Sequence, residues 1–254
     1  VSAWLKCHYP DVFCCALLNA QPMGFYKPAQ LISDAKSHGV EVRPVDVNHS
    51  HWESTLEPTG HARHALRLGF RLVSGLGAAE AGRIASARIS GYENIEQMMR
   101  QADISGQAME ALAKADAFRS IGLDSRQAYW HIRKHKRQRH HQLPLFAGIA
   151  ADDQTDTHTD NSASFLPQAQ IGEQVSADYE ATGLSLKAHP VAVLRSVLAE
   201  SGWQSCSQID KATEGRRLHL VGLVTMRQRP GTAKGTVFIT MEDGVRAVNV
   251  IIWH

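Results

Sequence analysis

The stretch Gly69-Phe-Arg-Leu-Val-Ser-Gly75-Leu76-Gly77-Ala-Ala-Glu-Ala-Gly-Arg-Ile-Ala-Ser-Ala-Arg88 decides how the chain is organised. An apolar segment runs into Gly-Leu-Gly, and apolar residues then recur at helical spacing from Ala78 onwards. Glycine takes a positive φ without penalty, and its missing side chain lets another backbone come close. We therefore expect a tight turn that opens a helix.

Such a turn is suited to holding phosphate. The first N–H groups of a helix are unpaired and lie at the positive end of its dipole, so they bind phosphate oxygens. This is the logic of a helix-hairpin-helix, which contacts the nucleic-acid backbone without reading bases. An ordinary turn between two core helices is the alternative. The predicted DNA contacts are Ser74, Gly75, Leu76, Gly77, Ala78, Arg83 and Arg88.

Length and charge set the limits. A chain of 254 residues favours two or three small domains over one core. The net charge is only +2, so a basic surface must come from local clustering. The chain begins with Val1 and stops after an apolar run at Trp253, which we interpret as a fragment cut at both ends.

Cysteine and apolar patterns indicate a cytoplasmic protein. The cysteines Cys7, Cys14, Cys15 and Cys206 show no Cys-x-x-Cys spacing, and the adjacent Cys14 and Cys15 are interpreted as buried apolar residues in a reducing compartment. No apolar run reaches membrane-spanning length. The histidines His49, His51, His61 and His64 have no carboxylate or cysteine pattern around them, so no metal site is predicted.

The first 60 residues predict helices and one short strand. A helical pair over residues 2–19 is broken at Pro10, and a helix from Pro28 ends at His38 with Gly39 as its cap. Residues 40–47 alternate apolar and polar, and Pro44 places that strand at a sheet edge.

Three segments here resemble a known family: Trp4-Leu-Lys-Cys-His-Tyr-Pro-Asp-Val-Phe, Leu18-Asn-Ala-Gln-Pro-Met-Gly-Phe-Tyr and His38-Gly-Val-Glu-Val-Arg-Pro-Val-Asp-Val-Asn. They are similar to the fingers region of bacterial C-family DNA polymerases, and to the error-prone branch most closely. The resemblance implies the end of the fingers at residues 1–60 and a tandem helix-hairpin-helix domain at 61–141. In its second, more degenerate copy, Gly122 separates two helices, and pure packing is an equal alternative to DNA contact.

A dense basic run, Arg133-Lys-His-Lys-Arg-Gln-Arg-His-His141, ends this domain. A solvated helix end is one interpretation, since cations are favoured at a helix C-terminus. A track for DNA phosphates is the other, and its contacts would weaken steeply with salt. The predicted contacts are Arg133, Lys134, Lys136, Arg137 and Arg139.

A docking peptide and a linker occupy residues 142–175. Gln142-Leu143-Pro-Leu145-Phe146 resembles the pentapeptide by which bacterial polymerases bind the sliding clamp, with Gln142, Leu143, Leu145 and Phe146 as contacts. Packing against the hairpin domain is the alternative. Residues 150–164 are polar and acidic without periodicity, so they predict a disordered linker.

The last part predicts a helical connector at 176–215 and strands at 216–254. Three segments are rich in β-branched and apolar residues and are separated by Gly or Pro turns: Leu218–Arg227, Gly235–Asp243 and Ala247–Trp253. This pattern is typical of the opening meander of an OB-fold barrel. Glu242-Asp-Gly-Val-Arg246 departs from the family's turn, so a rearranged hairpin is expected there. Arg227, Arg229 and Lys234 are candidate phosphate contacts, with surface solubility as the alternative.

The predicted fold class is multi-domain α+β, with a mainly helical N-terminal two-thirds and an incomplete OB-fold. The resemblance implies part of an error-prone DNA polymerase in damage tolerance, with primer-template duplex, single-stranded template, the sliding clamp and mutagenesis-complex proteins as partners. The family's magnesium ions are held by acidic palm residues expected before Val1, so no catalytic residue is assigned. The alternatives are a non-catalytic DNA-binding or scaffold protein of hairpin and OB modules, and a clamp-bound adaptor.

Overall fold

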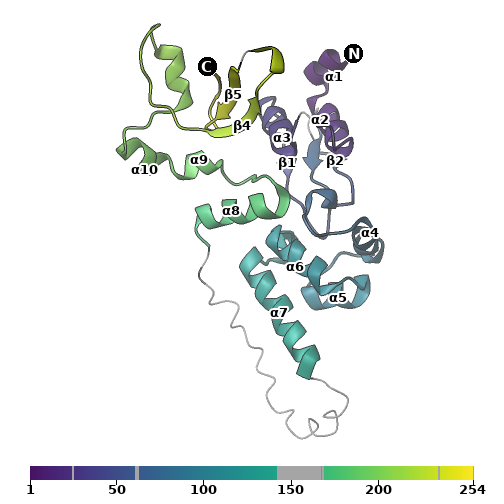
Figure 1. Ribbon diagram of the computed structural model, residues 1–254. Coiled ribbons are helices and arrows are strands. Elements are labelled where there is room, and N and C mark those ends of the chain that lie inside the picture. The colour runs from purple at the N-terminus through teal and green to yellow at the C-terminus, as the bar shows by residue number, and fades with distance from the viewer. Residues whose placement is uncertain (25, 61–62, 142–166, 168, 234, 254) are drawn as a thin grey trace, which may run out of the picture. The chain divides into compact units, whose positions relative to one another are not determined.

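The structure is a computed structural model that describes residues 1–253 with gaps at 25, 61–62, 142–166, 168 and 234. The chain divides into two compact units (Figure 1). The first contains Val1–Ala169 and Ala177–Leu184, and the second contains Gln170–Ser176 and Ser185–His254. The predicted class is confirmed: a helical N-terminal part precedes a small antiparallel sheet.

The first unit is mainly helical, and its early helices begin where the prolines predict. Pro10 and Pro28 occupy the first helical positions of α2 and α3, where a missing N–H costs nothing. Gly39 follows α3 with a φ of +79°. The helices that begin within this unit are α1 (Ser2–His8), α2 (Pro10–Asn19), α3 (Pro28–Ser37), α4 (Ala78–Ala87), α5 (Ile95–Ala102), α6 (Gly106–Lys114) and α7 (Ser125–His141).

A three-stranded sheet that was not predicted in full lies between α3 and α4 in the sequence. Its strands are β1 (Val42–Arg43), β2 (Thr55–Glu57) and β3 (Ala65–Arg67), in the order β1-β3-β2. β1 is an edge strand, as Pro44 indicates, but only two residues of 40–47 form it. β3 falls in the predicted hairpin domain, yet it pairs with two strands of the predicted fingers segment.

The lead-in to the hairpin is not an α-helix. It forms a single 3-10 turn, η1 (Phe70–Leu72), because its amides bond to a neighbouring segment. The Phe70 N–H donates to the His51 carbonyl, and the Arg71 N–H donates to that of Trp52. A Cβ on Gly69 would lie 2.4 Å from the Glu53 carbonyl carbon, so glycine allows this approach.

The core of the first unit joins this irregular segment to the helices. Fully buried side chains come from α2, β3, η1 and from each helix between α4 and α7; the largest are Leu18, Leu66, Leu68, Phe70, Ile84, Met98, Met109, Leu112, Phe118 and Ile132. Burial of each such side chain contributes about 1.5–3 kcal/mol. The segments on either side of the hairpin turn are therefore held by a well-packed core.

The second unit contains short helices followed by a β-meander. α8 (Ile171–Thr182) contributes residues to both units, and α9 (Pro190–Val193), α10 (Arg195–Glu200) and η5 (Cys206–Lys211) lie before the sheet. The strands β4 (Leu223–Gln228), β5 (Val237–Glu242) and β6 (Ala247–Ile252) pair antiparallel in sequence order, which confirms the predicted meander. The first strand starts at Leu223 rather than Leu218, after Leu220 bridges to Gln204.

The β5–β6 turn is organised by Asp243, which is 1% exposed. One carboxylate oxygen accepts the N–H groups of Val245 and Arg246, and the other accepts from Ser205 and Cys206. Gly244, with a φ of +81°, allows the turn. A regular pairing of Glu242 with Ala247 closes the hairpin.

Candidate nucleic-acid interface

The Gly-Leu-Gly turn exposes its glycines and buries the apolar residues on either side. Gly75 has a φ of +86°, in the left-handed region where glycine is favoured. Val73 and Leu76 are buried, whereas Ser74, Gly75 and Gly77 are exposed. The predicted contact residue Leu76 therefore packs in the core and positions the turn, while both glycines face solvent.

Helix α4 begins directly after the turn with an open N-terminus. Gly77 is its N-cap and has no side chain to accept a hydrogen bond. The first intrahelical bond runs from the Ala81 N–H to the Gly77 carbonyl, so the amides of Ala78, Ala79 and Glu80 precede the helical ladder. Ala78 and Ala79 are exposed. These amides are arranged as the hairpin hypothesis requires.

Glu80 and Ser74 link this turn to the rest of the unit. The Ser105 N–H donates to the Glu80 carboxylate at 3.0 Å. Hydrogen bonds from the Ser105 side chain and amide and from the Gly77 amide lower the pKa of Glu80, against burial, so it is ionised at neutral pH. The Ser74 N–H donates to the Ala181 carbonyl at 2.8 Å and is thus engaged within the protein.

The two arginines of this segment have different environments. Arg83 is half-exposed on α4, and its Nε donates to the Asp103 carbonyl at 3.1 Å. Arg88 reaches back to the β1–β2 connection, where its Nη1 donates to the carbonyls of Val47 and Ser50. Burial lowers the pKa of Arg88. Its guanidinium thus anchors a loop, and Arg83 is the cation placed near the open helix end.

The second hairpin repeats the first turn 47 residues later. Gly122 has a φ of +79° and α7 starts at Ser125, but Asp124 stands where the first copy has Gly77. The Asp124 carboxylate accepts the Gln127 N–H at 2.8 Å and caps α7. The Ser120 N–H donates to Asp46. The Asp124 carboxylate at the start of α7 and the Ser120 amide, already bonded to Asp46, favour a packing role over DNA contact for the second hairpin.

The predicted basic run, residues 133–141, lies on helix α7. It has no Asp or Glu over its 17 residues. Arg133 is exposed, and its guanidinium lies 5.1 Å from the centroid of the Tyr129 ring. Trp130, which we did not predict as a contact, is 48% exposed. The side chains of Lys136, Arg137 and Arg139 lie outside the described residues, although the helix reaches His141.

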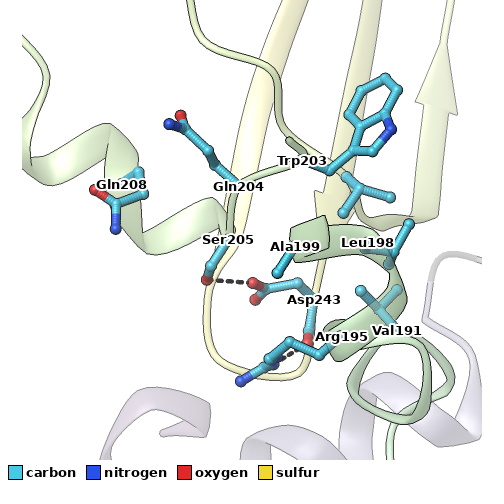
Figure 2. Close-up of a pocket in the computed structure, with 10 residues that line it drawn as sticks. Val191, Arg195, Leu198, Ala199, Trp203, Gln204, Ser205, Gln208 and Asp243 are labelled. Carbon is cyan, nitrogen blue, oxygen red and sulfur yellow. Dashed lines mark hydrogen bonds between the residues drawn. The ribbon is translucent and has the colours of Figure 1, made fainter. Parts of the chain in front are cut away.

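In the second unit, Arg227 and Arg229 are exposed at and just beyond the end of β4. Lys234 lies outside the described residues. A cavity of about 370 Å³ lies between α9–α10 and the segment from Trp203 to Gln208, with Asp243 at its wall (Figure 2). Arg195 donates to the Asp243 carbonyl there at 3.1 Å. Neither strand arginine lines this cavity.

Within the described residues, no group of three or more His, Cys, Asp or Glu side chains is placed to hold a metal ion. The same described part of the chain has no helix with the length and apolar character needed to cross a bilayer. The predicted clamp contacts Gln142, Leu143, Leu145 and Phe146 lie outside the described residues.

Known proteins similar to this chain point to the same motif. The family described as helix-hairpin-helix motif matches residues 39–128, which include both turns and the three-stranded sheet. The turn at Gly75 lies inside this helix-hairpin-helix match, as its sequence predicts.

Similarity to known proteins extends beyond that motif along the whole of this chain. An error-prone DNA polymerase of Brucella abortus biovar 1 (strain 9-941) is 46% identical over 253 residues, which cover 100% of this chain. Error-prone DNA polymerase 2 of Agrobacterium fabrum is 47% identical over 256 residues, and the error-prone DNA polymerase of Sinorhizobium medicae is 44% identical over 272. The chain spans 23–24% of the length of these relatives. The resemblance to error-prone DNA polymerases is confirmed.

Proposed function

We propose that this chain is a segment of an error-prone DNA polymerase and supplies contacts to the DNA backbone during template-directed synthesis in damage tolerance. The observation that carries the DNA contact is the open start of α4, where exposed Gly75 and Gly77 precede unpaired helix amides. Similarity of the whole chain to a segment of an error-prone DNA polymerase favours this function over a non-catalytic scaffold of the same modules.

The phosphate site is built from backbone rather than from side chains. A phosphate oxygen would accept the N–H groups of Ala78 and Ala79, at the positive end of the α4 dipole. Gly77 adds no side chain that would block the approach, and the Arg83 guanidinium, 4.0 Å from the Glu80 carboxylate on the same helix, supplies positive charge. Such contacts hold duplex DNA regardless of its sequence.

The catalytic chemistry belongs to the whole enzyme. We propose magnesium as its metal, held by acidic residues in the larger part of the enzyme, since this chain spans only 23–24% of the length of its polymerase relatives. Such ions would stabilise the attacking and leaving oxygens of nucleotidyl transfer. The residues present here bind and position DNA.

Two further expectations belong to this proposal. The sliding clamp would bind Gln142–Phe146, and co-elution of the chain with the clamp is the measurement that checks it. A cytoplasmic location accompanies a bacterial DNA partner, and fractionation of cells that express the tagged protein tests it.

Substitution of Gly77 tests the DNA contact. Its φ of −85° suits any residue, and a Cβ there would lie 3.8 Å from the Glu80 carboxylate, so Gly77→Val is expected to fold. Its branched side chain blocks a phosphate at the helix start. We expect duplex affinity to fall about tenfold for two unrelated sequences, as when charge-assisted hydrogen bonds are lost.

Gly82→Ala is the matched control. Gly82 lies inside α4, and a Cβ there meets nothing within 4 Å. Alanine in a helix interior stabilises by about 0.5–1 kcal/mol over glycine, and duplex affinity should stay at the wild-type value. Unchanged duplex affinity in folded Gly77→Val would contradict the proposed contact.

A further inference from the structure

Beyond the hairpin turn, the exposed face of α7 joins an aromatic ring to cations. Arg126, Trp130 and Arg133 are exposed at positions i, i+4 and i+7, so they share one side of the helix. The opposite side carries Ala128 and Ile132, each 1% exposed, which fix the helix on the core. Trp130, at the centre of this face, leaves 48% of its surface exposed to solvent.

The cations on this face are held in place by the protein. Arg133 stacks on the Tyr129 ring with 5.1 Å between its guanidinium carbon and the ring centroid. The Arg126 Nη1 donates to the Pro167 carbonyl at 3.1 Å. Glu96 forms an ion pair with His135, on another part of the helix. Arg126 and Arg133 therefore flank Trp130 along this face of the helix.

We propose that Trp130 is a stacking platform for an unpaired base of single-stranded DNA, with Arg126 and Arg133 holding the flanking phosphates. The proposal rests on the proposed DNA-binding function and adds a second kind of DNA contact to it. Base stacking on an exposed aromatic ring, combined with a positively charged track, is how proteins bind single strands without sequence preference.

Charge and chemistry select this occupant over an apolar partner. Helix α7 has six Lys or Arg and four His residues and no Asp or Glu among its 17 residues. An apolar protein surface would have to desolvate these charges without compensation. In a duplex, by contrast, the faces of the bases are stacked on one another, so a single strand is the nucleic acid that presents an unpaired base to the ring.

The test compares single-stranded and duplex binding by the full 254-residue chain. The probes are a fluorescent oligo(dT) and a fluorescent blunt duplex, measured by anisotropy at one fixed salt concentration. We expect Trp130→Ala to weaken oligo(dT) binding about tenfold, within the range for one stacked base, and to leave duplex affinity within about twofold. Trp130→Phe keeps a ring and should retain most of the affinity.

Trp4→Ala is the control, because Trp4 is 56% exposed and lies on α1 in the same unit. It removes an exposed indole without touching α7, so oligo(dT) affinity should not change. Equal losses for oligo(dT) and duplex in Trp130→Ala would overturn the stacking role. Unchanged oligo(dT) affinity would also overturn it. Both results are distinct from a failure of the hairpin contact, which Gly77→Val reports through the duplex.

Discussion

At the scale of single residues, the pKa of Asp243 links the β5–β6 turn to pH. Burial would raise this pKa, but hydrogen bonds from Ser205 and from the amides of Arg246, Val245 and Cys206 outweigh it and lower the pKa to about 2. An unfolded aspartate has a pKa of about 3.9. The depressed folded value stabilises the second unit above pH 4, and this stability is lost as pH falls from about 4 to about 2.

We therefore expect the free energy of unfolding of the second unit to fall by about 2 kcal/mol over that window. Asp243→Asn should remove most of this pH dependence, whereas Asp210→Asn should not, since Asp210 pairs with Arg246 at the exposed surface. Urea titrations read by hydrogen exchange in β5 and β6 measure it. The same pH dependence in wild type and Asp243→Asn would assign it to other groups.

The sequence predicts some residues of the candidate site and misses others for a physical reason. Gly75 and Gly122 were predicted as turn glycines because positive φ is a local demand, and both have it. Other contacts join residues far apart in the sequence. Glu80 accepts from Ser105, 25 positions away, and Arg88 donates to Val47, 41 positions away. Local patterns carry no signal for such contacts, which depend on how the elements pack.

At the scale of secondary structure, some boundaries likewise follow from local sequence, whereas the three-stranded sheet does not. Proline marks the starts of α2 and α3, so those boundaries follow from sequence. β2 and β3 have three residues each, too few for a period-two pattern to emerge. An ion cluster also joins the three strands: Glu57 of β2 accepts from Arg43 of β1 and from Arg67 of β3.

This cluster predicts unequal costs for its members. Arg67 is 8% exposed, so Glu57→Ala leaves a buried guanidinium without its carboxylate and should destabilise the first unit by about 3 kcal/mol. Arg43 is more exposed, and Arg43→Ala should cost below about 1 kcal/mol. Chemical denaturation of both variants compares them. Equal costs would show that burial of Arg67 does not set the energy of the cluster.

At the scale of the whole molecule, a net charge of +2 gives little attraction for DNA, so binding must depend on where cations lie. Six of the 27 Lys and Arg residues fall in the 17 residues of α7. If about five phosphates are contacted, the logarithm of the duplex association constant should fall with the logarithm of salt concentration at a slope of about −4.5.

Two charge-matched variants separate local clustering from net charge. Arg133→Gln and Lys6→Gln each remove one positive charge. Arg133 lies on the exposed face of α7, whereas Lys6 lies on α1 and pairs with Asp34 of α3. If local contacts control binding, Arg133→Gln should reduce the steepness of the salt dependence of oligo(dT) binding by about 0.7, as for one lost phosphate contact to a single strand, and Lys6→Gln should leave it unchanged. If net charge controls it, both variants will weaken oligo(dT) binding and reduce its salt dependence alike. Salt titrations of oligo(dT) anisotropy decide between them, because only a local contact makes the two slopes differ.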